Sequence, residues 1–387
     1  MIYDVLIIGG GPAGLSVASH LPQTLKVCVV HQDKEIGLPV RTSGVSWLSD
    51  CHALKLPEHV YHPIHSADVY SDHESAHFDI QSHTVVALDI TETYRHLASL
   101  SDHQNRDLLL NSKFLSAIEN ADGTYSADIR TPDGPHQITA RYLVDASGWH
   151  CAVLESLELN TAPTRKAVGI EYEYPLQEMD PNRVVIFFGK HALSAYGWAL
   201  PTRENTVRLG IGIIQPDNTT SPKTLMQQFL DSDAPERMNI PRPKDYHINA
   251  GILPAAPYEP QLVYNRVIRV GDSANMATPT LGEGIRTAIE SGRALGEALG
   301  QAIENGSETP LRRYEIDCAR RYQRNYRFGF MSNQRAASYT PEDWDRAVRR
   351  IARLDEATLA AVFRSEFTPW MIARTAFKTI LRKLRDR

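Results

Sequence analysis

A glycine-rich turn near the start of the sequence constrains this chain most. Residues 2–8 (IYDVLII) form an apolar, β-branched run, and the string GGGPAG (residues 9–14) follows it directly. A GxGxxG string between a strand and a helix is typical of dinucleotide-binding folds. Gly9 permits the tight turn, Gly11 lets the backbone approach a pyrophosphate, and Gly14 allows the helix to pack closely on the strand. The turn therefore predicts a pyrophosphate site at a helix N-terminus, where free N–H groups favour anions.

The segments that follow predict an α/β fold with a doubly wound, Rossmann-like domain. Residues 12–21 read as a helix with Pro12 in its first turn, and residues 25–30 read as a second buried strand. Mainly β patterns over 164–256 indicate an inserted antiparallel β platform. The expected domains are a discontinuous dinucleotide-binding domain (1–55, 85–163 and 264–308), a β-rich substrate domain (56–84 and 164–263) and a helical C-terminal region (309–387).

Shorter signals place further elements within this scheme. The pairs Asp122-Gly123 and Asp133-Gly134 lie between alternating segments, which predicts a meander of hairpins. Residues 91–103 and 282–303 read as helices. Residues 141–148 and 264–272 read as strands that belong to the nucleotide-binding sheet.

Composition narrows the functional classes. The 387 residues carry a net charge of −5, so the chain lacks the basic footprint of a nucleic-acid-binding protein. No run of about 18 apolar residues is present, which argues against a transmembrane helix, and the first residues lack the basic start of a signal peptide. Four scattered cysteines without a CxxC pair fit a reducing compartment. We expect a cytoplasmic protein that does not bind nucleic acid.

A second Pro/Gly-rich segment occupies residues 270–286 (VGDSANMATPTLGEGIR). It reads as a strand end followed by a loop that leads into a helix. Asp272 can accept a hydrogen bond from a polyol hydroxyl, and the N-terminus of the following helix can stabilise negative charge on a ring. These properties match a flavin, which has a ribityl chain and a ring that becomes anionic on reduction.

With these strings, the chain resembles a known group of proteins. GGGPAG, DASG (145–148) and GDSANMATPTLGEGI (271–285) are similar to the FAD-dependent oxidoreductases with the para-hydroxybenzoate-hydroxylase-type fold. Four strings resemble the geranylgeranyl reductase family more narrowly. They are EIGLPVR (35–41), AVGIEYEY (167–174), YGWALP (196–201) and PTLGEGIRTAIESGRA (279–294).

The resemblance, which runs from residue 1 to roughly 300, implies FAD as the cofactor and assigns its contacts. The pyrophosphate would meet the glycine turn, Arg41 would lie along the FAD, Ala146 would lie near the AMP half, and Asp272 would bind the ribityl chain. The loop before the long helix would line the isoalloxazine edge. The cofactor residues carried over are Gly9, Gly11, Pro12, Ala13, Gly14, Arg41, Ala146, Asp272, Pro279, Gly282, Glu283, Gly284 and Ile285. Tyr196, Trp198 and Pro201 would form the wall of the substrate cavity.

Three positions depart from the family pattern. Thr42 stands where many relatives carry a cysteine, and a hydroxyl cannot perform thiol chemistry. His31 and Gln32 replace the acid expected for the ribose hydroxyls; an imidazole or an amide can also bond a hydroxyl, or His31 is simply a solvent-facing strand end. Thr91 replaces an arginine, so we expect FAD to bind more weakly than is usual for the group.

The resemblance implies reduction of carbon–carbon double bonds of an apolar substrate, for example a prenylated one, by hydride transfer from reduced flavin. Tyr196 and Thr42 are the candidate proton donors. A flavin-dependent monooxygenase or halogenase of the same fold is an alternative, and so is a non-redox cyclase or isomerase resembling lycopene cyclase. Because no second GxGxxG string is present, electrons would come from NAD(P)H or from a separate carrier, such as a reductase or ferredoxin partner.

Two clusters of side chains allow either a structural or a functional interpretation. Seven histidines between residues 52 and 83 favour a solvated or cavity-lining role over a metal site, because Pro63 interrupts them and helical spacing is absent. Tyr196 and Trp198 alternate along a strand, so their rings either pack the platform core or line the cavity.

The C-terminal segment 370–387 (WMIARTAFKTILRKLRDR) has the pattern of a basic amphipathic helix. Such a helix can insert its apolar face into a membrane interface and place its cations near anionic headgroups. It can equally dock its apolar face on the protein itself. Peripheral membrane contact through 370–387 is therefore one of two expectations for this segment.

Overall fold

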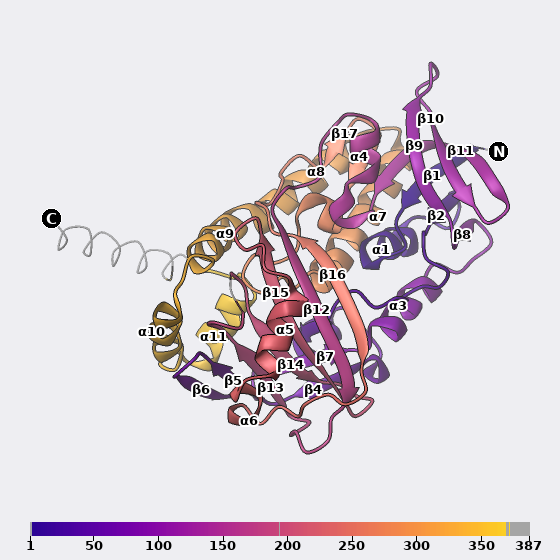
Figure 1. Ribbon diagram of the computed structural model, residues 1–387. Coiled ribbons are helices and arrows are strands. Elements are labelled where there is room, and N and C mark those ends of the chain that lie inside the picture. The colour runs from indigo at the N-terminus through magenta and orange to yellow at the C-terminus, as the bar shows by residue number, and fades with distance from the viewer. Residues whose placement is uncertain (1, 193, 369–370, 372–387) are drawn as a thin grey trace.

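A largely parallel sheet carries the glycine-rich turn, as the sequence predicts. The computed structural model describes residues 2–192, 194–368 and 371 (Figure 1). The sheet, called here the nucleotide-binding sheet, has eight strands. The spatial order of its main path is β17 (Val263–Tyr264), β18 (Val267–Arg269), β11 (Gly134–Asp145), β1 (Ile2–Ile8), β2 (Val27–Val30) and β8 (Arg106–Leu109). Neighbours from β18 to β8 run parallel, which confirms the doubly wound α/β class.

Two helices cover one face of the nucleotide-binding sheet and a meander covers the other. Helix α1 (Pro12–His20) packs on α7 (Ile285–Asn305), and the helices approach closely because Gly292 of α7 faces the backbone of Ala13. On the other face, β9 (Lys113–Glu119) and β10 (Tyr125–Thr131) form hairpins with β11, and α4 (Ala152–Ser156) contacts β9. The two Asp-Gly pairs connect these strands, so the predicted meander is confirmed.

A second sheet forms the predicted platform and is called here the platform sheet. The order of its seven strands is β16 (His247–Pro254), β12 (Lys166–Pro175), β15 (Thr206–Gln215), β14 (Gly197–Pro201), β13 (Arg183–Phe187), β5 (Ser66–Tyr70) and β6 (Ser75–Asp79). One expectation is corrected: the platform is not wholly antiparallel, because β13 pairs with β5 in parallel. No hairpin joins these two strands, since β5 and β6 come from an earlier part of the chain, and turn geometry therefore does not fix their relative direction.

A small third sheet lies among these elements. It pairs β3 (Val45–Trp47) and β4 (Tyr61–Ile64) with β7 (Val85–Leu88). Helix α2 (Leu48–Ala53) follows β3, and α3 (Ile90–Ser99) follows β7. Asp89 caps α3 by accepting a hydrogen bond from the Glu92 N–H, and the helix ends at Ser99, four residues before the predicted end at 103. The predicted domain boundaries stay a prediction.

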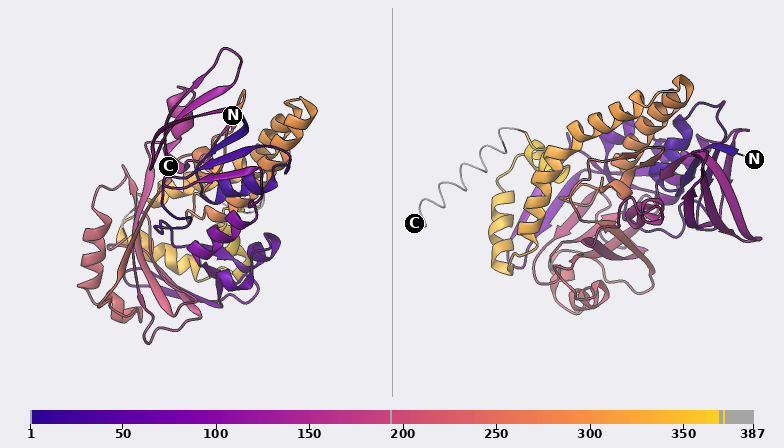
Figure 2. Two further views of the ribbon diagram at one scale, coloured as in Figure 1. Left: turned by 90° about the vertical axis from the view of Figure 1, so that its right-hand side faces the viewer. Right: turned by 90° about the horizontal axis from the view of Figure 1, so that it is seen from above.

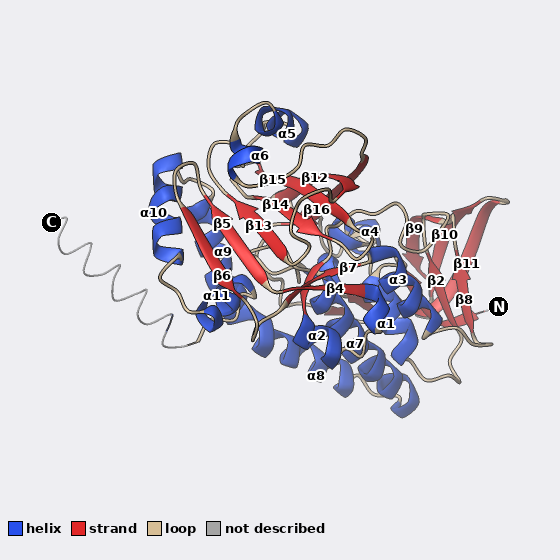
Figure 3. Ribbon diagram, turned by 90° about the horizontal axis from the view of Figure 1, so that it is seen from below, coloured by secondary structure: helices blue, strands red, loops and turns tan. Residues whose placement is uncertain are grey.

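Helices cover both faces of the platform sheet. Helices α5 (Pro222–Leu230) and α6 (Ala234–Arg237) pack against the face that carries Val185 and Phe187 (Figure 3). Successive strand residues point to opposite faces. Accordingly, the neighbouring Val184 belongs to a different cluster, with residues of α10 (Pro341–Ile351) and α11 (Glu356–Phe363).

The part of the C-terminal region that the structure describes is helical, as predicted. Helices α8 (Thr309–Cys318) and α9 (Arg324–Ala336) lead from the nucleotide-binding sheet toward α10 and α11, and Figure 2 shows this orange-to-yellow path. The segment 370–387 lies outside the described residues except for Met371, so its membrane contact stays a prediction. Among the described helices, none combines the length and apolar character needed to cross a membrane.

Candidate active site

The glycine turn forms an open cradle at the N-terminus of α1. Gly9 has a φ of +118°, and a Cβ there would overlap the Ala146 carbonyl oxygen. A Cβ on Gly14 would overlap the Gly9 carbonyl oxygen. A Cβ on Gly11, in contrast, would meet no protein atom within 4 Å, and no side chain caps the helix there. The turn thus packs tightly on its protein side and leaves space and free N–H groups where a pyrophosphate can bind.

The end of β2 holds this turn from the side. His31 Nδ1 accepts a hydrogen bond from the Gly10 N–H at 3.3 Å, and His31 Nε2 lies 3.5 Å from the Asp33 carboxylate. Burial lowers the pKa of His31, so the imidazole is neutral and carries its proton on Nε2. His31 therefore supports the turn. Its contact with a ribose, and that of the exposed Gln32, stay predictions.

Arg41 lies beside the same strand end, and its contact with the FAD stays a prediction. It donates two hydrogen bonds to Asp33, at 2.6 and 2.9 Å. The hydrogen bond from Arg41 lowers the pKa of the Asp33 carboxyl. The bidentate pair fixes the guanidinium at this position, while its side chain remains about half exposed, at 48%.

The second fingerprint packs directly against the first. Gly271 has a φ of +67°, and a Cβ there would lie 2.9 Å from the Ala13 Cβ. Asp272 follows, half-buried, and its carboxylate accepts no hydrogen bond from any described residue. Burial raises the pKa of Asp272 to about 6. A desolvated carboxylate without donors, next to the glycine cradle, fits the hydroxyl groups of a ribityl chain.

The loop before α7 connects this carboxylate to a cavity. Gly284, at the N-cap of α7, has no side-chain cap, and a Cβ on it would lie 3.4 Å from Asp272 Oδ1. Gly282, Glu283, Gly284 and Ile285 all line the cavity. Pro279 instead packs against Gly329 of α9 and does not belong to the described lining.

An apolar cavity lies between the platform sheet, the α7 loop and α11. Thr42, Tyr196 and Trp198 belong to its wall, and the rings of Tyr196 and Trp198 lie 5.6 Å apart. Pro201 is buried at the end of β14 and does not reach the cavity lining that the structure describes. The apolar lining residues are Val45, Trp47, Ala67, Ile80, Val85, Val184, Ile186, Trp198, Leu281, Ile285, Leu359, Ala360 and Phe363.

Tyr196 keeps its proton inside this cavity. Its hydroxyl donates a hydrogen bond to the carbonyl oxygen of Leu281 in the α7 loop. Burial raises the pKa of the Tyr196 phenol above its usual value. Tyr196 is therefore protonated at neutral pH, as a proton donor must be.

A buried polar network behind the cavity wall was not expected from the sequence. Trp198 Nε1 donates a hydrogen bond to Glu171 at 2.8 Å, and Asn249 donates a second at 3.3 Å. Glu171 is nearly fully buried, and burial raises the pKa of its carboxyl. The sequence did carry one signal for this network, the acids at alternate positions of the string GIEYEY (169–174). Alternate residues of a strand share one face, so two acids lie together on one side of β12.

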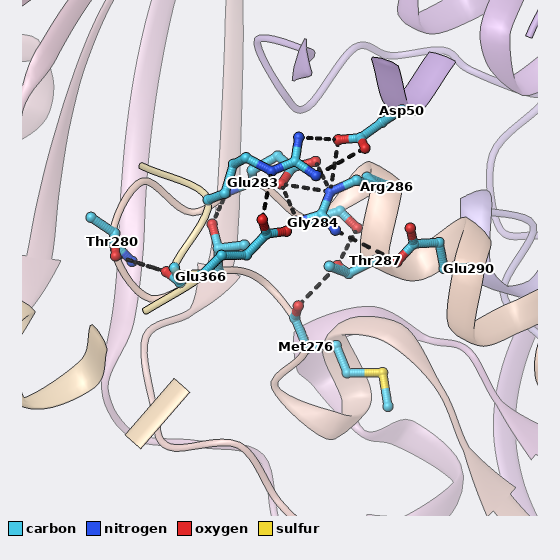
Figure 4. Close-up of polar contacts among 12 residues, drawn as sticks. Asp50, Met276, Thr280, Glu283, Gly284, Arg286, Thr287, Glu290 and Glu366 are labelled. Carbon is cyan, nitrogen blue, oxygen red and sulfur yellow. Dashed lines mark hydrogen bonds and ion pairs between the residues drawn. The ribbon is translucent and has the colours of Figure 1, made fainter. Parts of the chain in front are cut away.

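A second network joins the α7 loop to the segment after α11 (Figure 4). Arg286 lies 3.0 Å from Glu283 and 3.2 Å from Asp50. Asp50 also accepts two hydrogen bonds from Arg364, at 2.7 and 2.9 Å. Helix α11 thus forms one wall of the cavity. The ion pairs of Asp50 connect the segment after this helix to α2 and to the start of α7. Only the Glu283–Arg286 spacing was visible in the sequence.

Histidines of segment 52–83 contact different residues and do not share a common site. His73 Nδ1 contacts Asp345 at 2.9 Å, His77 Nδ1 contacts Asp68 at 2.6 Å, and His62 contacts the Pro181 carbonyl. In the part of the chain that the structure describes, no three histidine, cysteine or acidic side chains gather as a metal site would require.

Replacing Asp272 by asparagine is expected to separate cofactor binding from stability. FAD affinity should fall about tenfold, because the charged acceptor is replaced by the neutral amide oxygen of asparagine, which forms a weaker hydrogen bond. The apoprotein should gain on the order of 1–2 kcal/mol at pH 7.5, because the variant lacks the penalty that burial places on the charged form of Asp272. The penalty applies fully above pH 6 and disappears near pH 4, where the wild-type carboxyl is protonated. Denaturant unfolding of the two apoproteins at both pH values checks this; an equal difference at both would contradict it.

Known proteins match most of this chain in sequence. The family described as FAD binding domain matches residues 2–329. A digeranylgeranylglycerophospholipid reductase of Methanosphaera stadtmanae is 29% identical over 331 residues, which are 80% of this chain and 81% of that protein.

Solved structures show the same fold. A geranylgeranyl bacteriochlorophyll reductase-like protein from Thermoplasma acidophilum matches with a TM-score of 0.82 and 22% identity, over 94% of this chain and 95% of that one. A p-nitrophenol 4-monooxygenase from Pseudomonas putida matches with a TM-score of 0.72 and 16% identity, over 94% and 98%. The chain belongs to the FAD binding domain family and is an FAD-dependent oxidoreductase that is similar in sequence to digeranylgeranylglycerophospholipid reductases.

Proposed function

We propose that this protein reduces carbon–carbon double bonds in an apolar, isoprenoid-like chain. The observation that carries the proposal is the continuity of the apolar cavity with the loop before α7. Gly282 to Ile285 belong both to the residues assigned to the flavin edge and to the cavity lining. A substrate in the cavity would therefore lie against the cofactor's reactive end, with mainly hydrocarbon around it.

The chain's own residues fit FAD. The open cradle at Gly11 and the free N–H groups of α1 would hold the pyrophosphate, and Asp272 would accept hydrogen bonds from the ribityl hydroxyls. The uncapped N-terminus of α7 would face the ring and favour negative charge on it. FAD, when bound, supplies the hydride chemistry.

The cavity residues would position the alkene, exclude water and supply a proton. The apolar walls favour a hydrocarbon chain over water. Tyr196 holds a proton at its phenolic oxygen, next to the loop assigned to the flavin edge. To protonate a substrate carbon, the hydroxyl would turn away from the Leu281 carbonyl. Thr42 also lines the cavity and remains the second candidate donor.

Electrons would reach the flavin from outside the chain. The sequence contains one GxGxxG string, which the FAD uses, so we infer that NAD(P)H or a reduced carrier protein docks transiently.

Product analysis tests the proposal. The FAD-loaded protein is incubated with dithionite as electron source and geranylgeraniol as substrate, without oxygen. We expect products that gain two hydrogens per reduced bond, detected by mass spectrometry. With oxygen and NADPH in place of dithionite, an oxygenated or halogenated product would indicate the monooxygenase or halogenase alternative. An isomer of unchanged mass would indicate the cyclase class.

A further inference from the structure

The described lining of the apolar cavity carries acidic side chains but no lysine or arginine. Its charged or ionisable lining groups, among the residues described, are Glu283, Glu356 and His83, besides the phenol of Tyr196. Lysine and arginine are missing from that described lining. Among the described lining residues, a phosphate ester would therefore meet carboxylates and no cation, which is the reverse of the usual phosphate site.

Two arginines of the network that joins the α7 loop to the segment after α11 are already paired. Arg286 lies between Glu283 and Asp50, at 3.0 and 3.2 Å, and both acids are buried. Arg364 is bonded to Asp50 and lies 3.1 Å from Glu366. Recruiting Arg286 to a phosphate would remove the arginine that pairs with the buried Glu283 carboxylate, and recruiting Arg364 would remove one of the two arginines that pair with the buried Asp50.

A polar pair, His83 and Glu356, lies at another part of the wall. His83 precedes β7, and Glu356 is the first residue of α11. Their side chains are 38% and 23% exposed, whereas Leu359 and Ala360, also in the lining, are each only 3% exposed. The polar pair therefore lies where the cavity approaches solvent, and the apolar residues lie deeper.

Two polar atoms of this pair are unused. Glu356 Oε1 accepts a hydrogen bond from the His83 N–H at 2.6 Å, while Oε2 accepts none from the described residues. His83 Nδ1 lies 3.5 Å from Glu356 Oε1 and is buried without a hydrogen-bond partner. Unpartnered polar atoms at the outer part of an apolar cavity are the arrangement that fixes the polar end of an amphipathic ligand.

We propose that His83 and Glu356 bind the polar end of the substrate and that this end is an uncharged hydroxyl rather than a phosphate or diphosphate ester. The inference rests on the proposed function, since it concerns the chain whose double bonds are reduced. A hydroxyl can donate its one proton to Glu356 Oε2 and accept a hydrogen bond from a proton on His83 Nδ1, whereas a phosphate is repelled by the carboxylate. The Methanosphaera stadtmanae relative is named for a phospholipid substrate, so the polar end proposed here differs from the one in that name.

The test uses the full FAD-loaded protein, reduced without oxygen and mixed with geranylgeraniol, geranylgeranyl phosphate or geranylgeranyl diphosphate. The rate of flavin reoxidation divided by the apparent Kd gives the efficiency for each compound. We expect the alcohol to exceed both esters at least tenfold. Equal efficiencies, or a preference for an ester, would overturn this inference and leave the reductase function standing. Reoxidation by none of the three would overturn both.

Two variants test the assignment of the polar end. Glu356→Gln keeps an acceptor for the His83 N–H and removes the charge, so the discrimination against esters should shrink severalfold. Glu356→Lys should reverse it. The matched control is Glu304→Lys, an exposed position in the last turn of α7. If both Glu356 variants retain the wild-type preference, the polar end is not bound here.

Discussion

Replacing Gly11 by alanine is expected to raise the dissociation constant for FAD about 100-fold while the apoprotein stays folded. A Cβ at this position meets no protein atom within 4 Å, and the backbone there is extended, with φ of −85°, which alanine adopts readily. The methyl group would instead occupy the space needed by the pyrophosphate and break its charge-assisted hydrogen bonds to the N-terminus of α1. A 100-fold change corresponds to about 2.7 kcal/mol.

Gly14→Ala is the matched control, with a different expected outcome. Its Cβ would overlap the Gly9 carbonyl oxygen, so the variant should lose stability as well as FAD. Titration with FAD and thermal unfolding of each apoprotein separate the two effects. Wild-type FAD affinity in Gly11→Ala would contradict the assignment of the cradle.

Trp198→Ala is expected to reduce turnover at least tenfold and leave FAD content unchanged. The ring lies against Gly210, where any Cβ would overlap it, and forms part of the cavity wall. Removing the ring widens the cavity beside the substrate and should destabilise the fold by about 3 kcal/mol. The substrate would then no longer be held in one geometry against the flavin edge.

Trp198→Phe is the control for Trp198→Ala. It keeps an aromatic wall and removes only the hydrogen bond to Glu171, so most of the turnover should survive. Turnover is measured per bound flavin, beside the flavin content and the unfolding temperature. If Trp198→Ala loses flavin and stability in parallel and keeps its turnover per flavin, the ring packs the platform core and does not shape the substrate site.

The sequence predicted the parts of this molecule that local chemistry determines. Close packing at Gly9 and Gly14 requires glycine, and a GxGxxG string therefore identifies the turn. The Asp-Gly pairs indicated the hairpins of the meander, because tight hairpin turns need residues that adopt positive φ. Asp272 could be placed because it follows a strand end and precedes a helix in a short stretch of chain.

The features that the sequence could not show depend on contacts between distant segments. Asp50 and Arg364 are far apart in the chain, and nothing in either neighbourhood indicates the other. The parallel pairing of β13 with β5 has the same origin. The sequence also could not predict that α11 closes the cavity. An amphipathic pattern indicates which face of a helix is buried but not which element packs against it.

Single-turnover reoxidation of the reduced flavin tests the central claim most directly. The FAD-loaded protein is reduced without oxygen and mixed with an isoprenoid alcohol, and the oxidised-flavin absorbance is followed. We predict full recovery of that absorbance, in step with one saturated bond per flavin, and a slower reaction of the reduced protein with oxygen alone. A flavin that stays reduced in the presence of the isoprenoid and reacts rapidly with oxygen would contradict a reductase.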